Sequence, residues 1–143
     1  MLTIAFSTAG FFIAAYIHVT KKADIPLVCP LEGNCDRVIH SDYSKIMGVH
    51  VEVLGMIYYG CLTIFYLIYT LLPSFMPDYG PYIIVGVCLC GFLFSLYLTA
   101  IQMFVIKHWC TWCLLSAFVC TAIFVLTLFI ANTKVLELLT ALR

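Results

Sequence analysis

Four long apolar runs are the feature that most limits what this chain can fold into. They cover residues 2–20, 51–72, 81–106 and 110–132. Each is close to or above the roughly 20 residues that an α-helix needs to cross about 30 Å of hydrocarbon. Lipid offers no hydrogen-bond partners, so such runs are stable in a membrane as helices or closed barrels. The sequence therefore predicts an all-α membrane protein, a four-transmembrane-helix bundle that forms a single domain over residues 1–143.

The composition agrees with a membrane location and excludes one class of partner. Of the 143 residues, 64% are hydrophobic and only 10% are charged. Such values are far from those of soluble globular proteins. The seven basic and seven acidic residues cancel. Nucleic acid is excluded as a partner because phosphate binding needs a basic surplus that this chain lacks.

A polar loop at residues 21–50 separates the first two runs. It is too polar to span a membrane and too long for a tight turn, which is typical of a functional cap. Cys29 and Cys35 lie in it, and the Pro, Gly and Asn residues between them favour turns that can bring the two thiols together. Apolar residues interspersed among polar ones over 36–47 predict a short amphipathic helix along the membrane surface.

A second cysteine pair, Cys110 and Cys113, opens the fourth run with Cys-x-x-Cys spacing. Two thiols at this spacing can form a disulfide, and a helix N-terminus lowers the pKa of a nearby cysteine by favouring the thiolate. The break at residues 107–109 is so short that the third and fourth helices must be antiparallel neighbours. Four antiparallel helices then place this pair and the 21–50 loop at the same membrane face.

The remaining four cysteines lie inside the apolar runs, away from polar groups. They are Cys61, Cys88, Cys90 and Cys120. We expect them to be small buried hydrophobic side chains, as is common for cysteine.

Two thiol pairs at one face indicate an electron relay. A partner dithiol would pass electrons to the loop pair, and the loop pair would pass them to Cys110 and Cys113 by thiolate attack through mixed disulfides. At the edge of a bilayer the natural two-electron acceptor is a lipid-soluble quinone. Four antiparallel helices can enclose its flat ring between apolar walls.

Several motifs together resemble a known family. They are Cys29-x5-Cys35-Asp36-Arg37-Val38-Ile39-His40-Ser41-Asp42-Tyr43, Gly48, Leu54-Gly55-x-x-Tyr58-Tyr59 and Trp109-Cys110-x-x-Cys113-Leu114-Leu115-Ser116-Ala117. With this spacing, the chain resembles the vitamin K epoxide reductase family. It is most similar to the prokaryotic members, which oxidise protein thiols in the cytoplasmic membrane.

The resemblance implies a role for each cysteine of the two pairs. Cys113 would face the quinone, and Cys110 would be its partner and exchange with Cys35. Cys29 would be the outermost thiol, attacked by a reduced thioredoxin-fold partner. Many bacterial relatives carry a fused thioredoxin-like domain that is absent from this sequence, so we expect the partner to be a separate protein.

The resemblance also implies residues around the acceptor. The hydroxyl of Ser41 would lie beside the active site and support the chemistry or hydrogen-bond the substrate ring. Leu54, Tyr58 and Tyr59 would lie near the pocket of a ubiquinone-type or menaquinone-type quinone, together with Cys113. No metal is expected. Asp36 follows the second loop cysteine as in many prokaryotic members, and a solvated carboxylate explains it equally well.

Two other functions stay open at this point. Reduction of vitamin K quinone or its epoxide is one, although Val51-Glu52-Val53 stands where the vertebrate enzymes have an asparagine. The other is a structural zinc site formed by the four loop and helix cysteines, with His50 or His108 as a further ligand. The long gap between the loop cysteines is unlike the short spacing of zinc knuckles. Glu52 itself is explained by the helix dipole or by proton handling at the quinone.

The charge distribution and the resemblance disagree about orientation. Five basic residues lie at the cysteine-bearing face, namely Lys21, Lys22, Arg37, Lys45 and Lys107. Only Lys134 and Arg143 lie opposite. The positive-inside rule would place the cysteines in the cytoplasm. The common arrangement of the family places them outside it, where disulfides persist, and we expect that orientation with the inverted one as the alternative.

Overall fold

A computed structural model of the chain describes residues 1–23, 25, 27, 29, 35–41, 44–46, 48–72 and 79–141. For 36, 46, 134–139 and 141 it describes the backbone alone. The turn predicted between Cys29 and Cys35 therefore lies outside the described residues, as do the side chain of Asp36 and most of the 73–79 connection.

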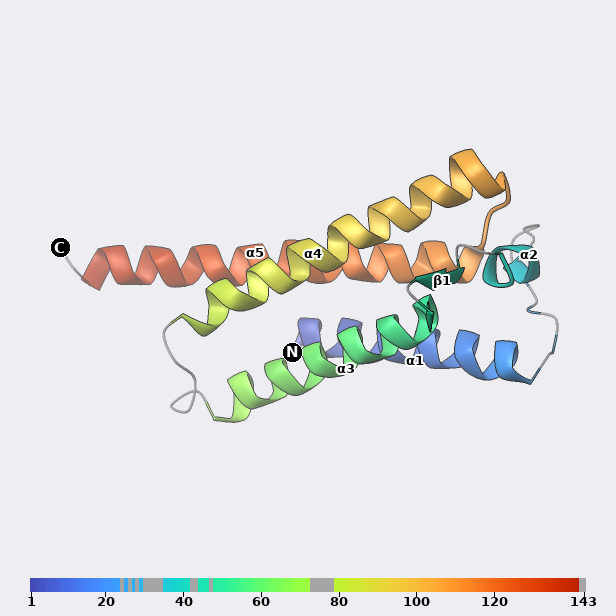
Figure 1. Cartoon of the computed structure of the whole chain (residues 1–143). Coiled ribbons are helices and arrows are strands. Elements are labelled where there is room, and N and C mark those ends of the chain that lie inside the picture. The colour runs from blue at the N-terminus through green and yellow to red at the C-terminus, as the bar shows by residue number, and fades with distance from the viewer. Residues whose placement is uncertain are drawn as a thin grey trace.

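Four long helices form the molecule, as the sequence predicted. They are α1 (Leu2–Lys22), α3 (Val51–Leu71), α4 (Gly80–Ile101) and α5 (Thr111–Ala141). A π-helical turn, η3 (Gln102–Ile106), extends α4. All four are long and apolar enough to cross a membrane, which confirms the predicted all-α, four-helix fold. Figure 1 shows that α1 and α4 end, and α3 and α5 begin, at the end of the bundle that carries α2 (Cys35–Ile39). We call this the cysteine end.

The helix termini follow from local sequence chemistry. Lys21 and Lys22 occupy the last turn of α1, where positive charge interacts favourably with the helix dipole. Glu52 occupies the first turn of α3, where negative charge does the same. Pro81 lies at the start of α4, the position in which its missing N–H costs no hydrogen bond. Short polar signals thus set where the apolar helices begin and end.

The last helix is longer than predicted. The fourth span was predicted to end at residue 132, with a small amphipathic tail over 133–143, and α5 continues through this tail without a break to Ala141. The residues after 132 include neither Pro nor Gly, and Lys, Leu, Glu and Ala favour helix. The chain therefore has no local reason to leave the helix at the end of its apolar run.

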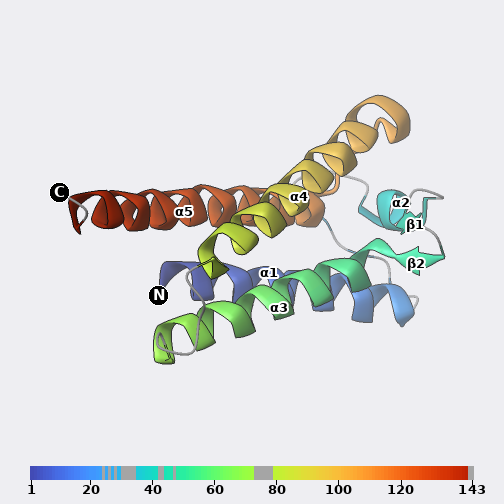
Figure 2. The ribbon, with the colours of Figure 1, turned by 60° about the vertical axis from the view of Figure 1, so that its left-hand side comes forward.

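The predicted amphipathic helix over 36–47 is wrong. The helix α2 stops at Ile39, and a small antiparallel hairpin follows, made of β1 (Lys45–Ile46) and β2 (Val49–His50). Figure 2 shows it beside α2. Ser41 ends the helix because both its N–H and its hydroxyl donate to the Val38 carbonyl. Gly48, with φ of 83°, supplies the left-handed backbone that a two-residue hairpin turn needs.

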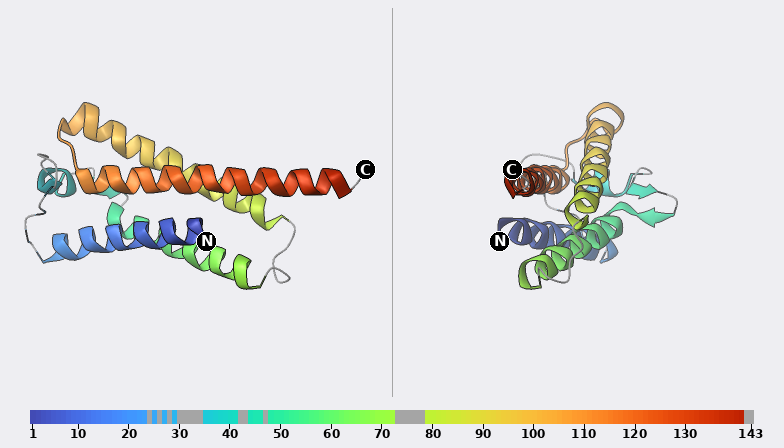
Figure 3. Two further views of the ribbon diagram at one scale, coloured as in Figure 1. Left: turned by 180° about the vertical axis from the view of Figure 1, so that it is seen from behind. Right: turned by 90° about the vertical axis from the view of Figure 1, so that its left-hand side faces the viewer.

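Close helix packing holds α1 against α3 and α5, while α4 packs on α5 (Figure 3). Gly10 of α1 lies against the ring of Tyr59, and a Cβ at Gly10 would come within 2.5 Å of that ring. The Thr63 hydroxyl donates to Ser7 Oγ across the same interface at 3.0 Å. Small residues and interhelical hydrogen bonds are the usual means of helix association in membranes. In Figures 1 and 2, α4 diverges from α3 toward the cysteine end.

Candidate redox site

The loop cysteines are joined to each other. Cys29 and Cys35 form a disulfide with their Cα atoms 5.7 Å apart. Cys35 begins α2, and its N–H donates to Cys29 Sγ at 3.1 Å. The first turn of a helix therefore presents this disulfide to the bundle.

The second pair sits at the start of α5. Cys110 precedes the helix, and its Sγ accepts a hydrogen bond from the Cys113 N–H at 3.3 Å. The Leu114 N–H donates to the Cys110 carbonyl at 3.0 Å. The Cys110 sulfur thus occupies the place of an N-capping oxygen. Hydrogen bonds from the Cys113 side chain and from the N–H groups of Cys113 and Trp112 lower the pKa of Cys110, although burial opposes them.

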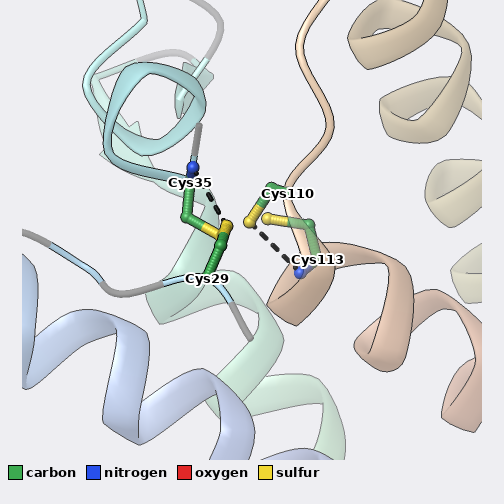
Figure 4. The surroundings of a disulfide bond; sticks show 4 residues. All are labelled: Cys29, Cys35, Cys110 and Cys113. Carbon is green, nitrogen blue, oxygen red and sulfur yellow. Dashed lines mark hydrogen bonds between the residues drawn. A yellow bond between two sulfur atoms is a disulfide. The ribbon is translucent and has the colours of Figure 1, made fainter. Parts of the chain in front are cut away.

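The two pairs meet in one buried cluster. Cys35 is 1% exposed and Cys110 is 0% exposed, and both belong to an apolar cluster with Ile17 and Val38. Cys29 and Cys113 pack against the same cluster. Figure 4 shows the loop disulfide facing the Cys110 and Cys113 sulfurs. Residues far apart in the sequence are therefore adjacent, as thiol–disulfide exchange requires.

A cavity of about 720 Å³ lies beside Cys113. Four of its polar lining residues lie near the cysteine end: Ser41, Ser44, Glu52 and Gln102. Apolar side chains such as Ile57, Val87 and Phe94 line it farther along α3 and α4. The volume and the mixture of an apolar wall with a few polar groups are typical of a site for a small organic molecule.

Comparison with known proteins agrees with this geometry. The model of the vitamin K epoxide reductase family matches residues 1–128. The chain belongs to the vitamin K epoxide reductase family. It is therefore an integral membrane oxidoreductase of a family that carries out disulfide-related redox chemistry. No curated protein matches the chain.

The residues that the family resemblance assigned to the acceptor all line the cavity. They are Ser41, Leu54, Tyr58, Tyr59 and Cys113. Two of the hydroxyls are engaged elsewhere. The Ser41 hydroxyl donates to the Val38 carbonyl at 2.7 Å, and that of Tyr59 donates to the Ser116 carbonyl at 2.8 Å. Tyr59 therefore fixes α3 to α5 and forms part of the wall.

The other four cysteines divide into two groups. Cys88 and Cys120 are buried, as expected. Cys61 and Cys90 are exposed on the helix surface, so the expectation of burial is wrong for them. Both lie in membrane-spanning helices, where a small apolar thiol is acceptable on the helix surface. Cys90 lines the cavity, whereas Cys61 does not.

An ion pair lies near the cysteines, and its Glu52 member lines the cavity. Lys21 Nζ lies 3.1 Å from Glu52 Oε1 and also donates to Ser44 Oγ at 3.1 Å. His18 Nδ1 is 4.0 Å from the same carboxylate oxygen. Glu52 was singled out from the sequence, but its partner Lys21 was not. A signal was available in the sequence. Lys21 lies at the C-terminal end of one predicted helix, where positive charge is favoured, and Glu52 lies at the N-terminal end of the next, where negative charge is favoured.

Gln102 was also missed. It is the one amide side chain within the 81–106 run, and it is buried in the cavity wall. A strongly polar residue within a membrane-spanning segment is itself a signal of function. Applied to this run, that signal would have found it.

The described residues contain no group of three or more His, Cys, Asp or Glu side chains arranged to hold a metal ion. In addition, Cys29 and Cys35 are consumed by their disulfide, which removes two of the four thiolate ligands that a zinc site would need.

Proposed function

We propose that this protein is a thiol:quinone oxidoreductase that oxidises a separate thioredoxin-fold partner, passes the electrons to a membrane quinone, and so supports protein disulfide formation. The observation that carries the proposal is the adjacency of the Cys29–Cys35 disulfide, the Cys110 and Cys113 thiols, and a cavity beside Cys113. This order of contacts matches the order of transfers that such a reaction needs.

The first exchange takes place at the loop pair. A thiolate of the partner attacks Cys29, which forms a mixed disulfide and releases Cys35 as a thiolate. The second thiol of the partner then attacks the mixed disulfide, so the partner leaves oxidised and the loop pair is left reduced. Cys29 suits this step because it is only partly buried, whereas Cys35 is almost fully buried and less accessible to a partner.

The second exchange joins the two pairs. The Cys35 thiolate attacks Cys110 in a Cys110–Cys113 disulfide, and Cys113 leaves as a thiolate. Attack by Cys29 on Cys35 then re-forms the loop disulfide and releases Cys110. The lowered pKa of Cys110 favours this release, because a thiol of lower pKa is a better leaving group.

The last step consumes the acceptor. The Cys110 and Cys113 pair gives up two electrons as its disulfide re-forms, and the quinone takes up these electrons and two protons to become a quinol. The sum is one partner dithiol and one quinone converted to one partner disulfide and one quinol. In the structure the loop pair is a disulfide while Cys110 and Cys113 are free, which in this scheme is the stage before quinone reduction.

The cysteine end is proposed to face away from the cytoplasm, where disulfides persist. One of the basic residues that argue for the opposite orientation, Lys21, is paired with a carboxylate, that of Glu52. A neutralised lysine contributes little to the charge bias. A membrane-impermeant thiol reagent applied from each side after reduction of the loop disulfide tests this orientation by labelling Cys29.

The deciding experiment is turnover of the purified protein with a short-chain quinone and a reduced thioredoxin-fold protein. We expect quinone consumption to be equal to partner oxidation, and Cys113→Ala to abolish it. Cys61→Ala is the matched control, because Cys61 is exposed on α3 and does not line the cavity. Absence of turnover in the unmodified protein, or full turnover in Cys113→Ala, would refute the proposal. The same assay with a quinone epoxide in place of the quinone tests the alternative function, epoxide reduction.

A further inference from the structure

Gln102 is a buried polar side chain that the reaction scheme above does not use. It begins the π-helical turn η3, is 5% exposed, and lines the same cavity as Cys113. Its Oε1 has no hydrogen-bond partner within the part of the chain that the structure describes. A buried polar group without a partner is destabilising, so its presence in a cavity wall indicates a ligand that supplies the partner.

The backbone N–H of Gln102 has hydrogen-bond partners among the described residues, unlike the side-chain oxygen. The Gln102 N–H donates to the carbonyls of Leu98 and Thr99. The π turn then ends at Lys107, whose φ of 56° redirects the chain toward Cys110. Single π-helical turns occur frequently at functional sites. Here the turn lies directly before the redox pair.

Other polar side chains at this end of the cavity already have partners. Ser41 donates to the Val38 carbonyl, and Lys21 pairs with Glu52 while bonding Ser44. Glu52 Oε1 also lacks a hydrogen bond, but it lies 3.1 Å from Lys21 Nζ, whose charge compensates it, whereas Gln102 Oε1 has no such neighbour among the described residues. Gln102 is therefore the best placed of these groups to interact with the polar ring of a bound molecule.

The amide suits both redox forms of the acceptor. A quinone oxygen can only accept hydrogen bonds, whereas a quinol hydroxyl can donate as well. A glutamine side chain carries both an acceptor oxygen and an NH₂ donor. We propose that Gln102 binds the ring oxygen of the quinone, donating from its amide to the carbonyl and accepting from the hydroxyl once the quinol has formed. This inference rests on the function proposed above.

The test separates quinone binding from thiol exchange. Gln102→Met keeps the length of the side chain and removes both hydrogen-bonding groups. We expect an increase of about fivefold in KM for the quinone, the size of one lost hydrogen bond, with an unchanged rate of exchange between the partner and the loop disulfide. The increase should be equal for a quinone without a side chain and for one with a short isoprenoid chain, because the contact is to the ring.

Met103→Leu is the matched control, since Met103 is exposed in the same π turn and does not line the cavity. An unchanged KM in Gln102→Met, or equal losses in thiol exchange and quinone reduction, would overturn the inference. A lack of quinone turnover in the unmodified protein would instead refute the proposed function. If Gln102→Met does not fold, the infrared carbonyl stretch of quinone bound to the unmodified protein is the deciding measurement. Two carbonyl bands at unequal frequencies support a hydrogen bond to one ring oxygen. A spectrum like that of free quinone overturns the inference.

Discussion

Lys21 Nζ lies 3.1 Å from Glu52 Oε1 and ties the end of α1 to the start of α3. The two side chains are 11% and 6% exposed, so the pair is largely removed from water. Each charge also complements the dipole of its own helix. The pair fixes the wall of the cavity next to the cysteines, which makes its integrity important for both the fold and the site.

Removing one member of the Lys21–Glu52 pair should lower the stability of the fold strongly, and removing both should lower it much less. Lys21→Met leaves the Glu52 carboxylate buried without its partner, and we expect a loss of about 3–5 kcal/mol in the free energy of unfolding. In Lys21→Met/Glu52→Leu most of that loss should be recovered. Denaturation in detergent measures all variants. Lys22→Met is the control, because Lys22 is exposed, and a loss there equal to that of Lys21→Met would contradict the special role of the pair.

The pKa of Cys110 should depend on Cys113. The hydrogen bond from the Cys113 side chain is the largest cause of the lowered value, so Cys113→Ala should raise the pKa of Cys110 toward that of an ordinary thiol. Because the folded pKa lies below the unfolded one, the thiolate stabilises the fold above the unfolded pKa. That contribution is lost as the pH falls through the folded pKa. Ultraviolet thiolate absorbance against pH, with Cys110→Ser as the blank, measures the shift, and an unchanged pKa would disagree with this geometry.

The contact between Gly10 and Tyr59 should not tolerate a methyl group. In Gly10→Ala the new Cβ meets the buried Tyr59 ring at 2.5 Å, and we expect a loss of about 1–3 kcal/mol in stability despite the better helix propensity of alanine. Gly60→Ala is the matched control on α3, because its nearest neighbour lies at an ordinary 3.8 Å. Thermal unfolding compares the two. Equal melting temperatures would mean that the ring moves aside freely.

The order of the thiol pairs can be tested at Cys29. Cys29→Ala should abolish oxidation of the protein partner, because the loop disulfide cannot form. It should leave reduction of quinone by a small dithiol intact, since Cys110 and Cys113 remain. Parallel assays with the protein partner and with a small dithiol as reductant measure the two activities separately. Oxidation of the partner at the normal rate by Cys29→Ala would show that the assigned order is wrong.

The Ser41 hydroxyl can act in quinone reduction or serve only to end α2, and Ser41→Ala distinguishes the two roles. If its hydroxyl acts at the ring, Ser41→Ala should slow quinone reduction about tenfold and partner exchange much less, as expected for the loss of one hydrogen bond to the reacting substrate. If its only task is the hydrogen bond to Val38 that ends α2, both steps should slow equally. Single-turnover kinetics of the two half-reactions separate these outcomes.

The sequence determined the features that depend on local pattern. The four spans follow from the lengths of the apolar runs, and helix starts such as that of α4 follow from residues such as Pro81. The motifs around Cys29, Cys35, Cys110 and Cys113 were sufficient to indicate the family, because spacing along the chain is a property of sequence alone. Where local signals conflicted, as over 36–47, the turn chemistry of Ser41 and Gly48 prevailed over the amphipathic pattern.

Only the tertiary structure decided which side chains meet. Lys21 and Glu52 belong to different helices, and nothing local to either residue specifies the other. The unmet hydrogen bond of Gln102 became visible only when the helices packed and left a cavity beside it. Burial and partnership depend on how helices pack rather than on the sequence of any one of them. The pairing of distant residues therefore had to come from the fold itself.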